Sequence, residues 1–283
     1  MRHFAGIDEE YCSFDTASVL LQAIPYDGTS TWGKGADRGF SSFLNALENM
    51  ELYDIETNSE AYRNGIHILP DIGEDESPER VFEVVYQKTR ELLASNKYLT
   101  FFGGEHSVSI GVIKAFYEKY ENLTVLQLDA HADLRESYGG TRYNHACALH
   151  DASQNANLIQ VGIRSADSSE MQYLNREQCY FAEDIYADES WMDASIAQMS
   201  DQVYLTIDLD VLDPSIMPAT GTPEPGGLLW NTTIRYLRKV FEAKTVVGFD
   251  IVEFAPIEGQ HAPQFLVAKL YYKLLSYKFK YNG

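Results

Sequence analysis

Residues 124–133 read Thr-Val-Leu-Gln-Leu-Asp-Ala-His-Ala-Asp, a short β-rich run that changes abruptly into acidic and imidazole side chains. A short, mainly apolar run of this kind is typical of a strand buried on both faces. In an extended segment, residues i, i+2 and i+4 point to one side, so Asp129, His131 and Asp133 can converge on one point. The stretch therefore predicts a buried strand that is followed at its carboxyl end by a cluster of functional acidic and histidine side chains.

The same alternation of apolar runs and helical patterns extends outward along most of the chain. The expected strands are Val19–Ile24, Gly65–Pro70, Tyr98–Phe102, Thr124–Asp129, Leu158–Ile163, Val203–Leu209 and Thr245–Val252. The expected helices are Phe40–Met50, Pro78–Ser95, Ser109–Lys119, Leu228–Phe241 and Pro263–Tyr277. Strands separated by helices imply right-handed crossovers and a mainly parallel sheet. We therefore predict one α/β domain over residues 1–283, with helices on both faces of the sheet.

The composition narrows the class of protein. The 283 residues include 22 Lys and Arg against 42 Asp and Glu, which gives a formal net charge of −20, and 45% are apolar. That apolar content supplies a packed core and excludes intrinsic disorder. The charge argues against a nucleic-acid partner and against an anionic membrane surface, because both attract clustered Lys and Arg. It is compatible with a cationic small molecule, although a charge that only serves solubility gives the same number.

The cysteines and the N-terminus bear on the compartment. Cys12, Cys147 and Cys179 are too few and too scattered for a disulfide framework or a CxxC zinc site, so we expect reduced thiols. The N-terminus lacks the apolar core of a signal peptide. No stretch approaches the roughly 18–20 apolar residues that span a bilayer. We therefore expect a cytoplasmic protein.

Three other predicted strands are also followed by acidic or histidine residues, as in residues 129–133. The segments are Gly103-Gly104-Glu105-His106, Asp208-Leu209-Asp210 and Asp250-Ile251-Val252-Glu253. In open α/β sheets, ligands gather at the carboxyl ends of the strands. The glycine pair before His106 allows a tight turn that can bring the imidazole inward. We expect these ends to form one site.

Four carboxylates and two imidazoles are expected to be metal ligands: His106, Asp129, His131, Asp133, Asp208 and Asp210. Four packed carboxylates repel one another unless cations neutralise them, and two divalent ions would do so and hold a bridging hydroxide as nucleophile. Hard oxygen ligands without thiolate favour two Mn(II) ions, ahead of zinc and of magnesium. One such fragment alone could be a capping cluster or a turn, but three at successive strand ends predict a binuclear site.

The remaining histidines carry less information. His3 and His67 have no acidic partner pattern nearby, so we interpret them as surface or loop residues. His150 and His261 can lie near the site, but the sequence assigns them no role.

At these motifs the chain resembles the ureohydrolase (arginase/agmatinase) family. The segments that carry the resemblance are Pro25–Gly28, Phe102–Ser107, Val125–Asp133, Thr206–Asp210, Asp213-Pro214, Pro223, Gly226-Gly227 and Gly248–Pro256. They span roughly residues 20 to 280. The resemblance implies a three-layer α/β/α fold, a pair of Mn(II) ions and hydrolysis of guanidino compounds to urea and an amine. It also implies a homo-oligomer, often a trimer or hexamer.

The resemblance further implies roles for individual residues. Glu253 matches the family position that pairs with the NH groups of the guanidinium. His145 matches the position of a mobile acid/base histidine, although a cap on the next helix would also account for it. Asp133 is a second candidate for proton transfer, because a ligand carboxylate in contact with the hydroxide can pass on its proton. Asp250 is expected to support its strand end.

The loop over residues 134–144 bears on the substrate. It lacks the Asn/Ser set that arginases use for an amino-acid head group and resembles the bacterial agmatinase version. Agmatine, a small cationic guanidino substrate, is therefore expected to give urea and putrescine, as in polyamine biosynthesis. Guanidinobutyrase, arginase and formimidoylglutamase, which share the same chemistry, remain alternatives. Arg135 or Arg142 could bind a substrate carboxylate, which keeps guanidinobutyrate open. A non-catalytic metal-binding protein of this fold is the alternative from a different class.

Overall fold

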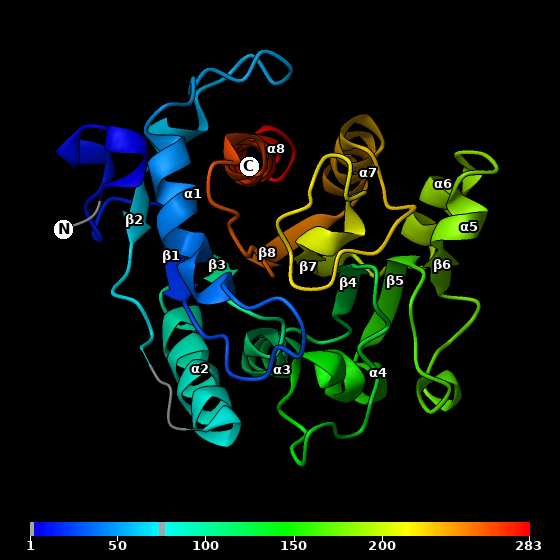
Figure 1. The fold of residues 1–283 in the computed structure, drawn as a ribbon. Coiled ribbons are helices and arrows are strands. Elements are labelled where there is room, and N and C mark those ends of the chain that lie inside the picture. The colour runs from blue at the N-terminus through cyan, green and yellow to red at the C-terminus, as the bar shows by residue number, and fades with distance from the viewer. Residues whose placement is uncertain (1–2, 74–76) are drawn as a thin grey trace.

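The computed structural model describes residues 3–73 and 77–283, and these contain an eight-stranded parallel sheet (Figure 1). Its strands are β1 (Val19–Ile24), β2 (Ile66–Ile68), β3 (Tyr98–Gly103), β4 (Thr124–Leu128), β5 (Asn157–Ile163), β6 (Cys179–Phe181), β7 (Gln202–Asp208) and β8 (Thr245–Val252). They lie in the order β2-β1-β3-β8-β7-β4-β5-β6. The central neighbours β3, β8, β7 and β4 are the four strands that the sequence analysis associated with chemistry.

Helices cover both faces of this sheet (Figure 1). One layer contains α2 (Pro78–Leu93), α3 (Val108–Lys119) and α4 (His150–Asn155). The other contains α1 (Gly39–Leu47), α6 (Ser190–Ala197), α7 (Trp230–Ala243) and α8 (His261–Tyr281), and the short α5 (Ala182–Ile185) follows β6. Within the layers α2 packs on α3, α3 on α4, α1 on α8 and α7 on both α6 and α8. The predicted three-layer α/β/α fold is confirmed.

Strand alternation divides the core between the two faces. Phe102 packs on Phe43 of α1 with ring centroids 4.6 Å apart. Its neighbour on β3, Phe101, belongs to the apolar cluster on the opposite face, where the rings of Phe116 and Tyr204 lie 4.4 Å apart. Because each fully buried aromatic side chain stabilises the fold by about 1.5–3 kcal/mol, the two clusters fix the sheet from both sides.

Most elements were predicted from the sequence, and those that were missed are short. The bounds of β1 and β8 agree with the expected ranges, and the expected helix from Pro78 begins there, with Ser77 Oγ accepting a hydrogen bond from Arg80 N at 3.2 Å. That contact is an N-cap, and Pro suits the first helical position. The elements α4, β6, α5 and α6 were missed, because a strand of three residues and helices of four to eight residues are too short to show a hydrophobic period.

The interpretation of His67 as a surface or loop residue is wrong. His67 lies in β2 and is buried, and its Nδ1 hydrogen-bonds to the Cys12 carbonyl at 2.7 Å. The ring of Phe14 packs edge-on against it at 5.4 Å. The N-terminal segment therefore covers this edge strand, a long-range contact that the local sequence does not reveal. His3, by contrast, is exposed outside any strand or helix.

Two observations bear on the expected compartment. The three cysteines, Cys12, Cys147 and Cys179, are buried free thiols. Over the described ranges, no helix has both the length and the apolar character needed to cross a membrane.

Candidate active site

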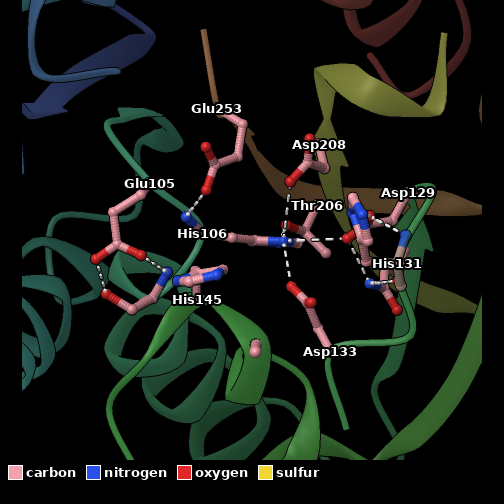
Figure 2. Close-up of polar contacts among 12 residues, drawn as sticks. Glu105, His106, Asp129, His131, Asp133, His145, Thr206, Asp208 and Glu253 are labelled. Atoms are coloured by element: carbon pink, nitrogen blue, oxygen red, sulfur yellow. Dashed lines mark hydrogen bonds and ion pairs between the residues drawn. The ribbon is translucent and has the colours of Figure 1, made fainter. Parts of the chain in front are cut away.

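The six predicted metal ligands lie at or just past the carboxyl ends of three central strands. Figure 2 labels five of them, all except Asp210. His106 follows β3, residues 129–133 follow β4, and residues 208–210 close β7. The strands are parallel, β3 pairs with β8, and β7 pairs with both β8 and β4. Their carboxyl ends therefore meet at one edge, which brings together side chains about a hundred residues apart in the chain.

His106 is surrounded by carboxylates. Its Nδ1 lies 3.1 Å from Asp129 Oδ2, 3.0 Å from Asp133 Oδ2 and 3.4 Å from Asp208 Oδ2, as Figure 2 shows. Although these distances are short, this buried nitrogen makes no hydrogen bond with acceptable geometry among the described residues. A buried nitrogen that faces three carboxylate oxygens without bonding to any of them is suited to share a cation with them.

Two groups of ligand atoms can each hold a metal ion. The atoms of His106, Asp129 and Asp208 all lie within 4.8 Å of one another, and so do those of Asp129, His131 and Asp210. In the second group, His131 Nδ1 is 3.0 Å from Asp210 Oδ2. Asp129 belongs to both groups, so the two candidate cation positions adjoin. Carboxylates and imidazoles without thiolate suit a hard divalent ion such as Mn(II).

Groups behind His106 fix its orientation. Its Nε2 lies 3.0 Å from Thr206 Oγ1, and the Thr206 hydroxyl donates to Asp250 Oδ1 at 2.6 Å. The Tyr204 hydroxyl donates to the other oxygen of Asp250 at 2.7 Å. Because Thr206 gives its hydrogen to Asp250, its oxygen accepts from Nε2–H, which leaves the lone pair on Nδ1. Asp250 thus supports the strand end, as expected.

The electrostatics of the site reflect a shortage of positive charge. Burial raises the pKa of Asp208 well above its usual range, and the charges of Asp210 and Asp129 add to the effect. Burial also raises the pKa of Asp133 to about 7, together with the charge of Asp129. For Asp129, burial opposes ionisation, but the neighbouring imidazoles of His106 and His131 hold its pKa below the usual range. The cluster as a whole is suited to bind cations.

Glu253 faces the same space from the end of β8. Its Oε1 accepts a hydrogen bond from the backbone N–H of His106 at 2.8 Å (Figure 2), and its own N–H donates to the Gly104 carbonyl at 2.8 Å. Burial and the charge of Glu105 raise the pKa of Glu253 well above its usual range. Glu253 has a φ of +63° and Asp133 one of +53°, left-handed values that are uncommon for non-glycine residues.

A cavity of about 260 Å³ opens over these groups. Its lining includes His131, Asp133, His145, Asp208 and Glu253. It therefore joins the ends of β4, β7 and β8 to the loop that carries His145.

His145 begins a 3-10 turn over His145–Cys147. The cap of that turn is Asn144, whose side chain accepts from Ala146 N at 3.1 Å, so His145 is not a helix cap. Burial lowers the pKa of His145 to about 4, with a further contribution from the charge of His131. The imidazole is therefore neutral near pH 7.

Two residues of this site were missed by the sequence analysis. Thr29 Oγ1 lies 2.9 Å from Glu105 Oε2 and 3.2 Å from His145 Nδ1. Glu105 lies within the Gly-Gly-Glu-His segment, so its position beside His106 was a usable signal. Thr29 directly follows the segment Pro25–Gly28 in the loop after β1, but its sequence neighbours do not indicate a contact with Glu105 or His145.

The remaining candidates lie at the margin or outside. Arg135 lines the cavity, with Nη2 3.6 Å from Asp167 Oδ2 and Nε 3.9 Å from Glu170 Oε2. Arg142 is exposed and does not line that cavity. His150 Nδ1 bonds to the Leu134 carbonyl at 2.9 Å and supports the loop. His261 is exposed at the start of α8.

Known proteins with this sequence pattern share the whole fold. Residues 17–276 match the family model described as "Arginase family". The chain belongs to the arginase family. Family membership makes it a ureohydrolase, a hydrolase that acts on carbon–nitrogen bonds of linear amidines.

Individual relatives match over nearly their full lengths. N(1)-aminopropylagmatine ureohydrolase of Synechocystis sp. is 32% identical over 280 residues, covering 95% of this chain and 92% of the relative. Agmatinase of Pyrococcus horikoshii is 30% identical, covering 92% and 91%. The crystal structure of agmatine ureohydrolase of Thermoplasma volcanium superposes with a TM-score of 0.86 at 30% identity, covering 95% of this chain and 92% of that one.

Proposed function

We propose that this chain is a binuclear manganese amidinohydrolase that hydrolyses agmatine to urea and putrescine, a reaction of polyamine biosynthesis. One observation carries the proposal. Two adjoining groups of metal-ligand atoms share Asp129, and the cavity above them is also lined by Glu253 and His145. A nucleophile source, a guanidinium anchor and a proton carrier thus face one space.

The donor set fits two divalent ions. Asp129 would be shared, with His106 and Asp208 on one side and His131 and Asp210 on the other. Asp133 lies within 3.0 Å of His106 Nδ1 and would complete the first side. Bound divalent ions lower the pKa of water and so supply the attacking oxygen at neutral pH.

Glu253 positions the guanidinium. Its Oε1 is held by the His106 backbone N–H, so Oε2 is the oxygen available to accept an N–H of the substrate. A charge-assisted contact of this kind fixes the planar group with its carbon facing the ligand cluster. Addition of the water oxygen to that carbon and cleavage of the carbon–nitrogen bond convert R-NH-C(NH2)2+ and H2O into R-NH3+ and urea.

Both protons that the leaving nitrogen gains come from the water. A neutral imidazole can accept a proton and pass it on, and His145 is neutral near pH 7 because burial lowers its pKa. Asp133 is the second carrier, since it lines both the ligand cluster and the cavity. In this proposal Glu253 orients the substrate, and His145 and Asp133 transfer protons.

The walls of the cavity favour a cationic tail. The cavity's one described arginine, Arg135, lies close to the carboxylates of Asp167 and Glu170, which reduces its attraction for a substrate carboxylate. Glu224 Oε1 lies 3.8 Å from Nε2 of His131, which lines the cavity. These acidic groups suit the ammonium of agmatine. They also suit the longer polyamine tail of N(1)-aminopropylagmatine, the substrate in the name of the Synechocystis relative, which we retain as second candidate.

Release of urea, or of formamide from formimidoylglutamate, tests these alternatives. The purified chain, freed of metal and reloaded with Mn(II), Zn(II) or Mg(II), is assayed with agmatine, N(1)-aminopropylagmatine, arginine, guanidinobutyrate and formimidoylglutamate. We expect the highest kcat/KM for agmatine with Mn(II). A higher kcat/KM for another compound replaces the substrate assignment. Absence of product from every compound with every metal contradicts the catalytic assignment and favours the non-catalytic alternative.

A further inference from the structure

The loop after β1 is fastened to the turn that follows β3. Gly104 N donates to the Ile24 carbonyl at 2.8 Å, and Glu105 N donates to the Tyr26 carbonyl at 2.8 Å. A Cβ on Gly104 would lie 1.9 Å from the Tyr26 oxygen, so only glycine permits this approach. Because the two segments approach so closely, Thr29, three residues beyond Tyr26, lies beside the side chain of Glu105.

Glu105 is a buried carboxylate with a complete set of donors. Its side chain is 0% exposed. Ser107 Oγ donates at 2.5 Å, Ser107 N at 3.2 Å and Thr29 Oγ1 at 2.9 Å. A buried carboxylate held by three donors has one fixed orientation. It is an acceptor, so it determines the direction in which the Thr29 hydroxyl points.

The Thr29 hydroxyl connects this acceptor to His145. Its oxygen accepts the backbone N–H of His145 at 3.0 Å and lies 3.2 Å from the ring nitrogen Nδ1. A hydroxyl has one hydrogen, and Glu105 accepts it. The oxygen can therefore only accept from Nδ1, which must carry the ring proton. The lone pair then belongs to Nε2, the other ring nitrogen.

We infer that Thr29, oriented by Glu105, is a positioning residue for His145: it holds the imidazole as the Nδ1–H tautomer with Nε2 free to exchange protons in the cavity. The inference deepens the proposed function, because it rests on His145 being the proton carrier. Thr29 touches His145 rather than the substrate in this assignment. The ring of Tyr138, edge-on at 6.3 Å, supports the same imidazole without a hydrogen bond.

A spectroscopic test addresses the tautomer directly. Full-length protein labelled with nitrogen-15 histidine and loaded with diamagnetic Zn(II) is studied by NMR, and the His145 signals are identified by their loss in His145→Gln. We expect the Nδ1–H tautomer in the wild type and in Thr29→Ser, and a shift toward Nε2–H in Thr29→Val. An Nε2–H wild type, or an unchanged tautomer in Thr29→Val, overturns the inference. This readout does not require turnover, so it remains decisive even if the proposed function fails.

The second test measures kcat, KM and manganese affinity of the Mn(II)-loaded variants. Loss of a hydrogen bond that orients a proton carrier is expected to lower kcat about 10-fold in Thr29→Val, with KM and manganese affinity unchanged. Thr29→Ser keeps the hydroxyl and should recover kcat to within about 2-fold of the wild type. Thr16→Val, at an exposed threonine that does not line the cavity, is the matched control. A loss in Thr29→Val that Thr29→Ser does not recover indicates a packing role and contradicts the inference.

Discussion

The site contains the same three-group chain twice, built from different parts of the fold. In each chain a histidine ring nitrogen contacts a threonine hydroxyl that donates to a buried carboxylate. The two chains are His106–Thr206–Asp250 and His145–Thr29–Glu105. The first joins the ends of β3, β7 and β8, whereas the second joins a loop, a turn and a short 3-10 segment. We refer to them as the strand chain and the loop chain.

The two chains share the same order of groups but differ in how far their residues are buried. All three members of the strand chain are at most 1% exposed. In the loop chain only Glu105 is fully buried, while Thr29 and His145 are half-buried. A rigid, dry setting suits a metal ligand, whose lone pair must keep one direction. A setting that opens onto a cavity suits a group that takes up and releases protons. The same arrangement of threonine and carboxylate thus orients one histidine that is suited to bind metal and another that is suited to transfer protons.

The largest effect is expected where both cation positions meet. Asp129→Asn removes the carboxylate shared by the two ligand groups, so bound manganese and urea release should be lost together, with kcat/KM reduced at least about 1000-fold. Metal analysis and the urea assay on the same sample measure both. Asp193→Asn, at a largely exposed aspartate paired with Lys239, is the matched control. Normal metal content with normal turnover in Asp129→Asn would remove Asp129 from the ligand set.

Next in size is the histidine of the loop chain. His145→Gln should lower kcat about 100-fold, as expected for a general acid–base residue, while the bound manganese stays at its wild-type level. That combination separates the loop chain from the strand chain. His261→Gln, at the exposed start of α8, is the control. Loss of manganese in His145→Gln would instead place His145 among the metal ligands.

The threonine of the strand chain should show the opposite pattern. Thr206→Val leaves His106 Nε2 without its partner, so manganese affinity should fall about 10-fold, and excess Mn(II) should restore kcat. Thr100→Val is a close match, since Thr100 is an equally buried strand threonine that pairs with Tyr271 away from the ligands. Competition with a chelator measures the affinity. A kcat that stays low at saturating Mn(II) would show that the strand chain does more than orient a ligand.

The strand chain lies close to what the sequence made predictable. Alternation along an extended segment places His131 and Asp133 with Asp129, and parallel strands place their carboxyl ends together. His106 and Asp250 follow from the same rules. Only the identity of the partner behind His106, Thr206, required the register between β7 and β8, in which Thr206 lies opposite Asp250.

The loop chain could not be found in this way. Thr29 reaches Glu105 across 76 positions of sequence and His145 across 116. No periodicity connects a loop to its partners, because the contact depends on how closely Gly104 lets two turns approach. His67 illustrates the same limit, since only the fold shows that the N-terminal segment covers it. Contacts between loops are set by packing that no single segment encodes.

The smallest effect is expected at the outer wall, on the loop that leads to His145. Arg135 lies over the ring of Tyr138 at 4.5 Å and close to Asp167 and Glu170. Arg135→Gln removes a cation from a wall that receives a cationic tail, so the KM for agmatine should fall about 2- to 5-fold with kcat unchanged, the range of a partly exposed ion pair. Glu170 keeps its place, because it also accepts backbone hydrogen bonds from Leu134 N and Asp167 N.

Measuring Arg135→Gln with guanidinobutyrate as well as agmatine distinguishes the two candidate substrates. Its carboxylate would use Arg135 as a partner, so an enzyme built for it should lose affinity in Arg135→Gln, whereas an enzyme built for agmatine should gain affinity for its own substrate. Arg142→Gln, exposed and away from the cavity lining, is the control and should change neither KM. If guanidinobutyrate has the lower KM in the wild type and that KM rises in Arg135→Gln, Arg135 is a carboxylate anchor and the proposed substrate is wrong. A fall in KM for agmatine alone indicates that the loop side of the cavity discriminates by charge, while the strand side supplies the chemistry common to both substrates.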